Sequence, residues 1–331
     1  MTGFDEQDLR LAAAAAIRAP SLHNSQPWQF RLADGAIEIL ADAQRQLAVA
    51  DSGGWAVRIA CGAATYNARL ALAVNGSPAT VTLRPERGSD VIARLTPDVA
   101  RPPTYPERDL FRAIGHRYSN RRPFWPDPVP SEARAALLEA AREEGAWMDL
   151  LVGMTALGGF AQIAQSADRV LRRDFAYQAE MNSWIHADAA ADGVPVTAGG
   201  PMAEPDDLLP QRPYGLHRRG AGRDFEPEPL VAILGTAADH PADQIVAGQA
   251  LQRVLLTATS AGLASSMISQ PIEVPAARDQ LRRSLRRHGT PQIAIRLGYG
   301  DPGKLSPRRD LDEVLSGETL RPSAEHPRPA R

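Results

Sequence analysis

Cysteine is nearly absent from this sequence of 331 residues, and the single Cys61 excludes a disulfide within the chain and a thiolate metal cluster. Cys61 lies in the apolar stretch 59–63, where a small buried side chain is the expected role. The seven histidines are scattered, without the short spacings that metal ligands show. We therefore expect no metal site.

Net charge and long apolar runs are lacking as well. Lys304 is the only lysine beside 36 arginines, yet the formal net charge is −2, so no concentrated positive surface for nucleic acid is expected. The densest basic run, 282–287, has helical spacing and is expected to be a solvated face. No run approaches the roughly 18 apolar residues of a membrane helix, and the first ten residues are acidic rather than signal-like. These features predict a soluble, cytoplasmic protein without a nucleic-acid or membrane partner.

What is present is a globular composition, 44% apolar and 23% charged, with internal repetition. Glu6, Leu11 and two alanines recur 126 residues later around Leu137, while Gly62 and Gly76 recur 186 residues later as Gly248 and Gly262. Chance likeness of alanine-rich helices is the alternative. We predict two related halves, 1–105 and 106–320, with about 60 extra residues in the second because the second offset exceeds the first by 60. A disordered tail is expected over 321–331.

Local patterns predict helices and strands in both halves. The expected helices are 6–18, 54–76, 107–116, 131–144 and 241–261. The expected strands are 28–32, 36–40, 79–84, 147–152, 230–235 and 292–299. The proline-rich segment 96–106 reads as the linker between the halves.

Few motifs carry chemistry. No phosphate-binding P-loop, dinucleotide-binding glycine motif, zinc motif or nucleophile elbow occurs in the expected context. Polar side chains and prolines are concentrated in 19–28, Ala-Pro-Ser-Leu-His-Asn-Ser-Gln-Pro-Trp. Two prolines stiffen this loop, which is rich in hydrogen-bonding side chains. A helix end followed by a turn is the simpler interpretation of its composition.

The string Ala-Pro-Ser-x-x-Asn-x-Gln-Pro-Trp in 19–28 resembles the signature of the flavin-dependent nitroreductase family, which binds FMN at a homodimer interface. Arg117-Tyr118-Ser119-Asn120-Arg121 resembles the opening of such a subunit, but it heads the second half. The segment 262–268 resembles the part beside the flavin ring, and Arg308 lies in a stretch similar to the phosphate-binding region. A fused pair with a long insert is similar to the Acg family. The resemblance covers about 8–315.

The resemblance implies an α+β, nitroreductase-like fold, in which the two halves of one chain form a pseudo-dimer with mixed or antiparallel sheets flanked by helices. The first half has no Arg-x-Ser-x-Arg before residue 9, and the second has 141–147 in place of the proline–asparagine loop. Only one of two interfacial sites can be complete. We expect one FMN per chain, and a monomer with internal pseudo-two-fold symmetry.

The resemblance also implies roles for individual residues. The phosphate of FMN would be held by arginines, which bind such a dianion through bidentate, charge-assisted bonds. Surface salt bridges are the alternative for these arginines, and a packed loop residue is the alternative for His23. The phosphate candidates are Arg117, Arg121 and Arg308, with Ser119 as an additional donor. The ring and ribityl candidates are Ser21, His23, Asn24 and Gln26 on one side and Ser265, Ser266, Met267 and Ile268 on the other. No catalytic side chain is expected, because the flavin itself carries hydride chemistry.

The predicted insert at about 165–225 decides between functions. Its stretch 169–185 has apolar residues at helical steps, including Val170, Tyr177, Met181 and Trp184. A glycine- and proline-rich loop follows, and its end at 211–216 offers an aromatic and an aliphatic anchor. Ordinary core packing is the alternative to our interpretation that the insert is a lid over the flavin. A covered flavin favours FMN sequestration or storage, or very restricted redox activity. The alternatives are an active NAD(P)H-dependent FMN oxidoreductase of the nitroreductase or quinone reductase type, and a scaffold that has lost its flavin.

Overall fold

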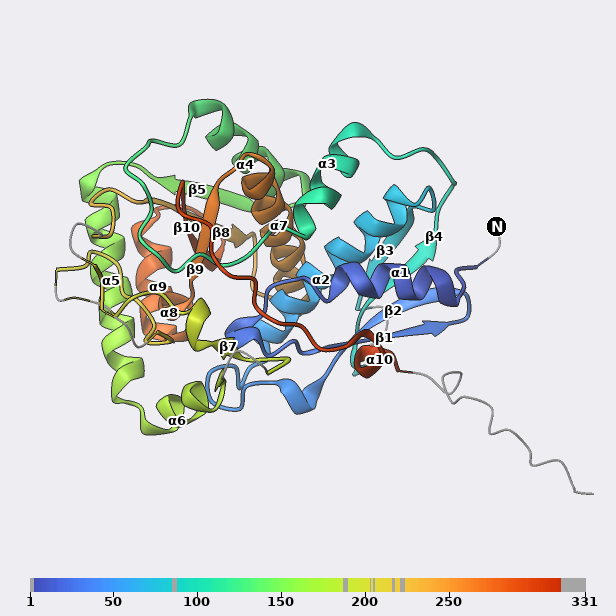
Figure 1. Cartoon of the computed structure of the whole chain (residues 1–331), viewed down its shortest axis with the longest axis horizontal. Helices are drawn as coiled ribbons and strands as arrows, with labels where there is room; N and C mark the ends of the chain where they lie inside the picture. Colours follow the sequence, from blue (N-terminus) through green and yellow to red (C-terminus); the bar gives the residue numbers. More distant parts are fainter. Residues whose placement is uncertain are drawn as a thin grey trace, which may run out of the picture.

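Two four-stranded antiparallel sheets and a central pair of helices form the framework of the computed structural model (Figure 1). The structure describes residues 3–84, 88–186, 190–202, 204, 206–215, 218–220 and 224–316. One sheet lies on each side of helices α2 (Trp55–Val74) and α7 (Pro241–Ser260), which pack against each other. The predicted α+β fold with antiparallel sheets flanked by helices is confirmed.

The first sheet has the strand order β1-β2-β4-β3 and packs on α1 and α2. Its elements are α1 (Glu6–Ala16), β1 (Trp28–Ala33), β2 (Ala36–Ala41), β3 (Ala79–Leu83) and β4 (Val91–Pro97). Two short 3-10 turns, η1 (Leu22–Asn24) and η2 (Ala43–Arg45), flank β1 and β2. Helix α1 starts at a capping box, in which Asp5 accepts from the backbone N–H of Asp8 at 3.0 Å. The core beneath this sheet contains the fully buried Trp28 and Phe30.

The second sheet has the order β5-β8-β10-β9 and packs on α4 and α7. Its elements are α4 (Ser131–Glu143), β5 (Trp147–Leu151), β8 (Leu230–Thr236), β9 (Ala264–Ile268) and β10 (Thr290–Gly298). Helix α3 (Tyr105–Ile114) precedes α4, and α8 (Gln270–Glu273) and α9 (Pro275–Ser284) lie between β9 and β10. Strand β10 is buried along nearly its whole length, which places the two β9 serines and Arg296 deep in the molecule.

The central helices approach each other through two glycines. A Cβ on Gly62 would lie 2.2 Å from the carbonyl oxygen of Ile245, and a Cβ on Gly248 would lie 2.2 Å from the carbonyl oxygen of Ile59. Both positions therefore require glycine for this close approach. Gly248 lies 186 residues after Gly62, and Ile245 lies 186 residues after Ile59, which is the offset seen in the sequence. Each glycine therefore contacts the position that corresponds to its partner's contact, as a two-fold relation between the halves would require.

The sequence analysis missed two strands of the four-stranded sheets, β4 and β9. Val91, Ile92, Ala93 and Leu95 of β4 are buried, and the expected linker 96–106 begins inside this strand. Proline is tolerated there because Pro97 is the last strand residue, and the connection to α3 therefore runs over 98–104.

The connection between β5 and β8, here called the insert, runs over 152–229. It therefore begins before and ends after the expected segment of about 165–225. The single helix expected over 169–185 is two, α5 (Met154–Arg173) and α6 (Phe175–Ser183). The chain leaves helical geometry at Asp174, whose carboxylate accepts from the N–H of Tyr177 at 3.1 Å and so caps α6. The strand pair β6 (Ile185–His186) and β7 (Val194–Pro195) and the turn η3 (Val196–Ala198) follow. Val170, expected on the apolar face, is 53% exposed.

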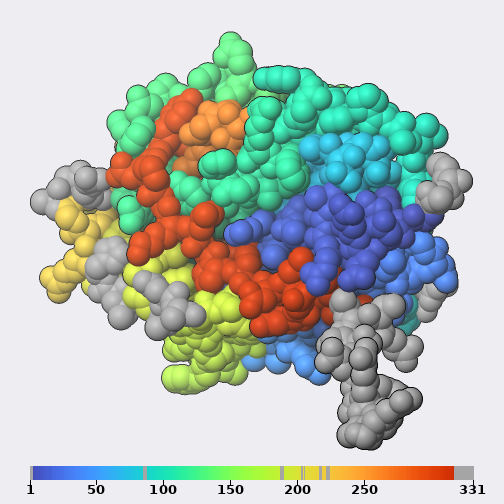
Figure 2. Space-filling model, turned by 45° about the vertical axis from the view of Figure 1, so that its right-hand side comes forward, coloured from blue at the N-terminus to red at the C-terminus, as the bar shows by residue number. Residues whose placement is uncertain are grey.

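After β10 the chain crosses back to the first sheet. The segment 299–316 forms a red band across the surface in Figure 2, beside the blue N-terminal residues. It ends with α10 (Leu311–Val314) and a parallel bridge between Leu315 and Phe30. The tail predicted over 321–331 lies outside the described residues, as do Pro205 and Leu216 of the predicted lid. Within the described residues, no helix is both long enough and apolar enough to span a membrane.

Candidate functional site

The loop at 19–28, here called the signature loop, has an unusual backbone conformation. His23, Asn24 and Gln26 have φ angles of 52°, 57° and 51°, a region that non-glycine residues rarely adopt. Each such residue costs on the order of 1–3 kcal/mol and persists only where its surroundings fix it. Here the N–H of Gln26 donates to Ser21 Oγ at 2.9 Å, and the Cys61 thiol donates to the Pro27 carbonyl at 3.3 Å.

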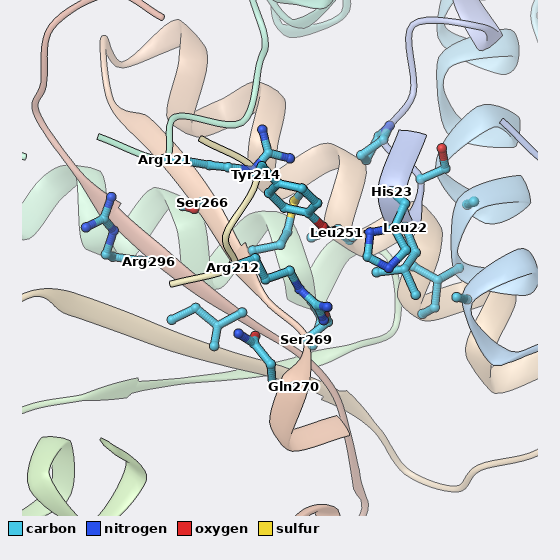
Figure 3. Close-up of a pocket in the computed structure, with 18 of the residues that line it drawn as sticks. Leu22, His23, Arg121, Arg212, Tyr214, Leu251, Ser266, Ser269, Gln270 and Arg296 are labelled. Atoms are coloured by element: carbon cyan, nitrogen blue, oxygen red, sulfur yellow. Dashed lines mark hydrogen bonds between the residues drawn. The ribbon is translucent and has the colours of Figure 1, made fainter. Parts of the chain in front are cut away.

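Beside this loop lies a cavity of about 880 Å³, here called the large cavity (Figure 3). Its floor comes from the central helices and from β9 and β10, which contribute apolar side chains. The lining residues are Pro20, Ser21, Leu22, His23, Trp55, Ala56, Ile59, Ala60, Arg121, Pro210, Gln211, Arg212, Tyr214, Leu251, Ser266, Met267, Ile268, Ser269, Gln270, Ile293 and Arg296. A ligand in this space would contact the loop at 19–28, helix α2, strands β9 and β10, and the insert.

A second space of about 520 Å³, here called the arginine cavity, shares four lining residues with the large cavity. It is lined by Arg18, Pro20, Ser21, Asn24, Ile114, Gly115, Arg117, Tyr118, Ser119, Arg121, Met267, Leu305, Ser306 and Arg308. Four of these described lining residues are arginines and none is an aspartate or a glutamate. The shared residues place the two spaces side by side.

Arg117 has buried donors in the arginine cavity that no described residue accepts. It is 4% exposed, and its Nε and one terminal nitrogen have no hydrogen-bond partner among the described residues. Its other terminal nitrogen donates weakly to the Arg18 carbonyl at 3.3 Å. Burial and the nearby charge of Arg121 lower the pKa of Arg117 to about 10. A buried guanidinium without a counter-ion is costly, so this arrangement is suited to an anion that offers two oxygens.

Arg308 uses its donors differently. It donates to the carbonyl oxygens of Ile17 at 2.6 Å and Ala19 at 3.1 Å and to Asn24 Oδ1 at 3.0 Å. These bonds tie the C-terminal segment to the end of α1 and to the strained loop. Burial, followed by the charges of Arg117 and Arg18, lowers its pKa to about 9. Arg308 therefore contributes charge to the cavity while its hydrogen bonds hold the wall.

The segment that carries Arg117 and Arg121 is fixed against β9. Ser119 and Ser265 form a parallel bridge, and the N–H of Asn120 donates to the Ser265 carbonyl at 2.8 Å. Arg296, which is 2% exposed, donates to the Arg122 carbonyl at 2.6 Å and lies 3.3 Å from Glu226.

The insert supplies one wall of the large cavity. Tyr214 is 3% exposed, and Figure 3 shows it between Arg121 and His23. The Arg121 guanidinium lies 4.8 Å from the centre of its ring, and its hydroxyl lies 2.7 Å from His23 Nδ1. Arg212 pairs with Glu273 and Tyr177, and the Tyr177 hydroxyl donates to Glu273 at 2.7 Å. These contacts fasten the insert to α8 and to the signature loop.

Most of the predicted site residues line the two spaces. Ser21, His23, Arg121, Ser266, Met267 and Ile268 line the large cavity, and Ser21, Asn24, Arg117, Ser119, Arg121, Met267 and Arg308 line the arginine cavity. Gln26 and Ser265 line neither. Gln26 Nε2 donates to the Ala191 carbonyl at 3.0 Å and its Oε1 accepts from the N–H of Arg309 at 2.9 Å, so Gln26 holds the loop against its neighbours.

Several lining residues were not predicted. Arg18 lies directly before the signature loop, and this position in the sequence could have identified it as a site residue. Arg212 and Tyr214 stood in a stretch considered only as a lid anchor, while Trp55, Gln270 and Arg296 carried no motif. Trp184, expected to cover the site, lines neither space and packs 5.5 Å from the Arg45 guanidinium. No cluster of potential metal ligands occurs among the described residues.

Known proteins resemble this chain over most of its length. The family model described as "Nitroreductase family" matches residues 114–299. The Mycobacterium tuberculosis protein named "Putative NAD(P)H nitroreductase Rv3131" is 30% identical, covering 94% of this chain and 92% of its own. "Putative NAD(P)H nitroreductase acg" of the same organism is 28% identical over 93% and 95%.

Among solved structures, the FMN-dependent nitroreductase NfnB from Mycobacterium smegmatis, in complex with NADPH, is 20% identical. The match covers 66% of this chain and 99% of that one, with a TM-score of 0.41. The sequence relatives cover more than nine tenths of this chain, and the family match includes more than half of it. The protein belongs to the nitroreductase family, among its Acg-type members.

Proposed function

We propose that this chain binds one FMN, with the phosphate in the arginine cavity and the ring in the large cavity. The observation that carries the proposal is the pair of unused, buried donors on Arg117 in a space whose described lining has no carboxylate. A phosphate monoester near pH 7 carries almost two negative charges and three acceptor oxygens. It would supply both the counter-charge and the acceptors that this cavity needs.

The residues that would hold FMN follow from this placement. Arg117 would grip the phosphate bidentately, with Ser119 and Arg18 beside it and the charge of Arg308 behind. Ser21, His23 and the β9 residues 266–268 would contact the ring. Bound FMN supplies two-electron redox chemistry. The side chains bind, orient and exclude water, and we assign none of them as catalytic.

We further propose that the insert covers the bound flavin, so that the protein stores FMN or reacts only with a narrow set of partners. The wall made by Pro210, Gln211, Arg212 and Tyr214 supports this, because it is anchored at both ends of the large cavity. The insert also reaches the first half. Glu180 accepts from the backbone N–H of Ala50 at 2.8 Å, and Asn24 Nδ2 donates to the Gly193 carbonyl at 2.9 Å. Displacing it would break contacts on both sides of the site.

Titration and anaerobic reduction test this proposal. We expect FMN to saturate at one equivalent per chain, and the bound flavin to be bleached by dithionite but only slowly by NADH or NADPH. Tyr214→Ala should speed bleaching by NAD(P)H, while the matched control Tyr105→Ala, at a site 70% exposed, should not. No bound flavin at saturating FMN would contradict the proposal.

An active NAD(P)H-dependent FMN oxidoreductase is the second candidate, and the extent of the large cavity favours it. The space extends to Trp55 and Gln270, beyond the residues that we place against the ring. Rapid bleaching of the unaltered protein by NADH or NADPH would establish this function and reject the covered flavin.

A further inference from the structure

His23 lines the large cavity and has one ring nitrogen without a hydrogen-bond partner among the described residues. The side chain is 3% exposed, and its Nδ1 lies 2.7 Å from the Tyr214 hydroxyl. Its Nε2 is buried and has no hydrogen-bond partner among the described residues. His23 is also part of the cavity lining, so a ligand that contacts its ring would meet an unpaired nitrogen.

The imidazole is neutral near pH 7. Burial, followed by the positive charges of Arg212 and Arg121, lowers the pKa of His23 well below 6.5. One ring nitrogen therefore carries a hydrogen and the other is an acceptor.

Tyr214 decides which nitrogen carries the hydrogen. Burial raises the pKa of Tyr214, so its phenol keeps its hydrogen and needs an acceptor. Among the described residues, the hydrogen-bond partner of this hydroxyl is His23 Nδ1. When the phenol donates to Nδ1, the imidazole hydrogen sits on Nε2. Nε2 has no partner within the described part of the chain in either tautomer, but the opposite tautomer would also leave the phenol hydrogen without an acceptor, at a cost of about 1–3 kcal/mol for a buried group.

We propose that His23 Nε2–H donates a hydrogen bond to the ring system bound in the large cavity, and that Tyr214 is the positioning residue that fixes this tautomer. The ligand that suits this donor is a flat conjugated heterocycle with carbonyl or imine acceptors along its edge. The inference rests on the proposed FMN binding. It assigns to an insert residue the task of orienting a donor on the signature loop, 191 positions away in sequence.

Nitrogen-15 NMR of protein labelled at histidine tests the tautomer directly, with His23→Gln used to assign the signal. In FMN-free protein at pH 7 we expect neutral His23 with its hydrogen on Nε2, and in Tyr214→Phe a mixture of the two neutral forms. Adding FMN should shift the Nε2–H signal and slow its exchange with water. An imidazolium, or a hydrogen on Nδ1, would overturn the inference.

Affinity measurements supply a second readout. Glutamine retains an N–H near the position of Nε2, so His23→Gln should bind FMN within about twofold of the unaltered protein. His23→Phe keeps a ring without a donor and should bind about three- to tenfold more weakly, the range for one neutral hydrogen bond. Equal affinities for the two variants, or an Nε2–H signal unmoved by bound FMN, would reject the donor role. Absence of flavin absorbance at saturating FMN would instead reject the proposed function.

Discussion

The two adjoining cavities differ in whether their buried arginines have a carboxylate partner. Arg121, which lines both, has none among the described residues. In the large cavity, Arg212 faces the buried carboxylate of Glu273 and Arg296 faces that of Glu226. In the arginine cavity, Arg117 and Arg308 have no carboxylate partner among the described residues. Burial lowers their pKa values, as it also lowers that of Arg296. Burial affects all four, so the difference lies in the counter-charge. A compensated arginine stabilises the fold, whereas an uncompensated one is suited to a ligand.

This difference predicts two different results when an arginine is removed, although the composition of the cavities does not distinguish the two kinds of arginine. Removing a compensated arginine should damage the protein itself. Removing Arg117 should damage only the binding of an anion, and should relieve like-charge repulsion in the free protein. Removing Arg308 would also break the hydrogen bonds that hold the C-terminal segment.

The largest effect is expected for Arg212→Ala. This change leaves Glu273, which is 1% exposed at its side chain, without its cation, and breaking such a buried pair costs about 3–5 kcal/mol of unfolding free energy. Urea denaturation would measure the loss. Replacing both partners, Arg212→Met with Glu273→Leu, should restore most of it, and the exposed Arg283→Ala on α9 serves as the neutral control. A single variant as stable as that control would contradict the assignment.

Arg117→Ala should come next, with an effect on FMN affinity. A charge-assisted bond is worth about 1.5–3 kcal/mol, which corresponds to a ten- to hundredfold increase in Kd. Arg121→Ala should weaken binding less, because Arg121 already donates to the Ala198 carbonyl at 3.2 Å and lies against Tyr214. Equilibrium dialysis of both variants gives the order, and a larger loss for Arg121 would shift the phosphate toward the large cavity.

The smallest effect is a pH dependence of a few-fold in affinity. Binding should strengthen between about pH 5 and 7 as the phosphate loses its second proton, whose pKa is near 6. It should weaken above about pH 9, where free Arg308 and then Arg117 release protons. The FMN-free fold should gain stability over that alkaline range, since the unfolded state keeps protons that the folded state has lost. An affinity that rises steadily from pH 7 to 10 would contradict this.

The sequence predicted those parts of the fold that follow from local pattern. Helix α7 was expected at 241–261 and found at Pro241–Ser260, because proline opens it and buried apolar residues continue around it. Strand β4 was missed because Arg94 and the prolines around 97–103 interrupt its short apolar pattern. The break at Asp174 was also missed, since the apolar spacing runs on across a residue that prefers to cap a helix.

For the site, the sequence located the signature loop and the Arg117 segment but not the distribution of their hydrogen bonds. Arg308 and Arg117 look alike in the sequence. Only the fold shows that Arg308 donates to the end of α1 while Arg117 keeps two donors free. Likewise, the pairing of His23 with Tyr214 depends on how an irregular segment of the insert lies, which no periodicity describes.

The walls of the arginine cavity come from residues 18–24, 114–121, 267 and 305–308 of a single polypeptide. Mass action therefore gives this site a simple property. A binding site shared between separate subunits falls apart when the protein is diluted, so its occupancy depends on protein concentration as well as on ligand. Here the opposing walls are covalently tethered and stay at a fixed effective concentration. The fraction of protein carrying FMN should depend on free FMN alone, even at the lowest protein concentrations.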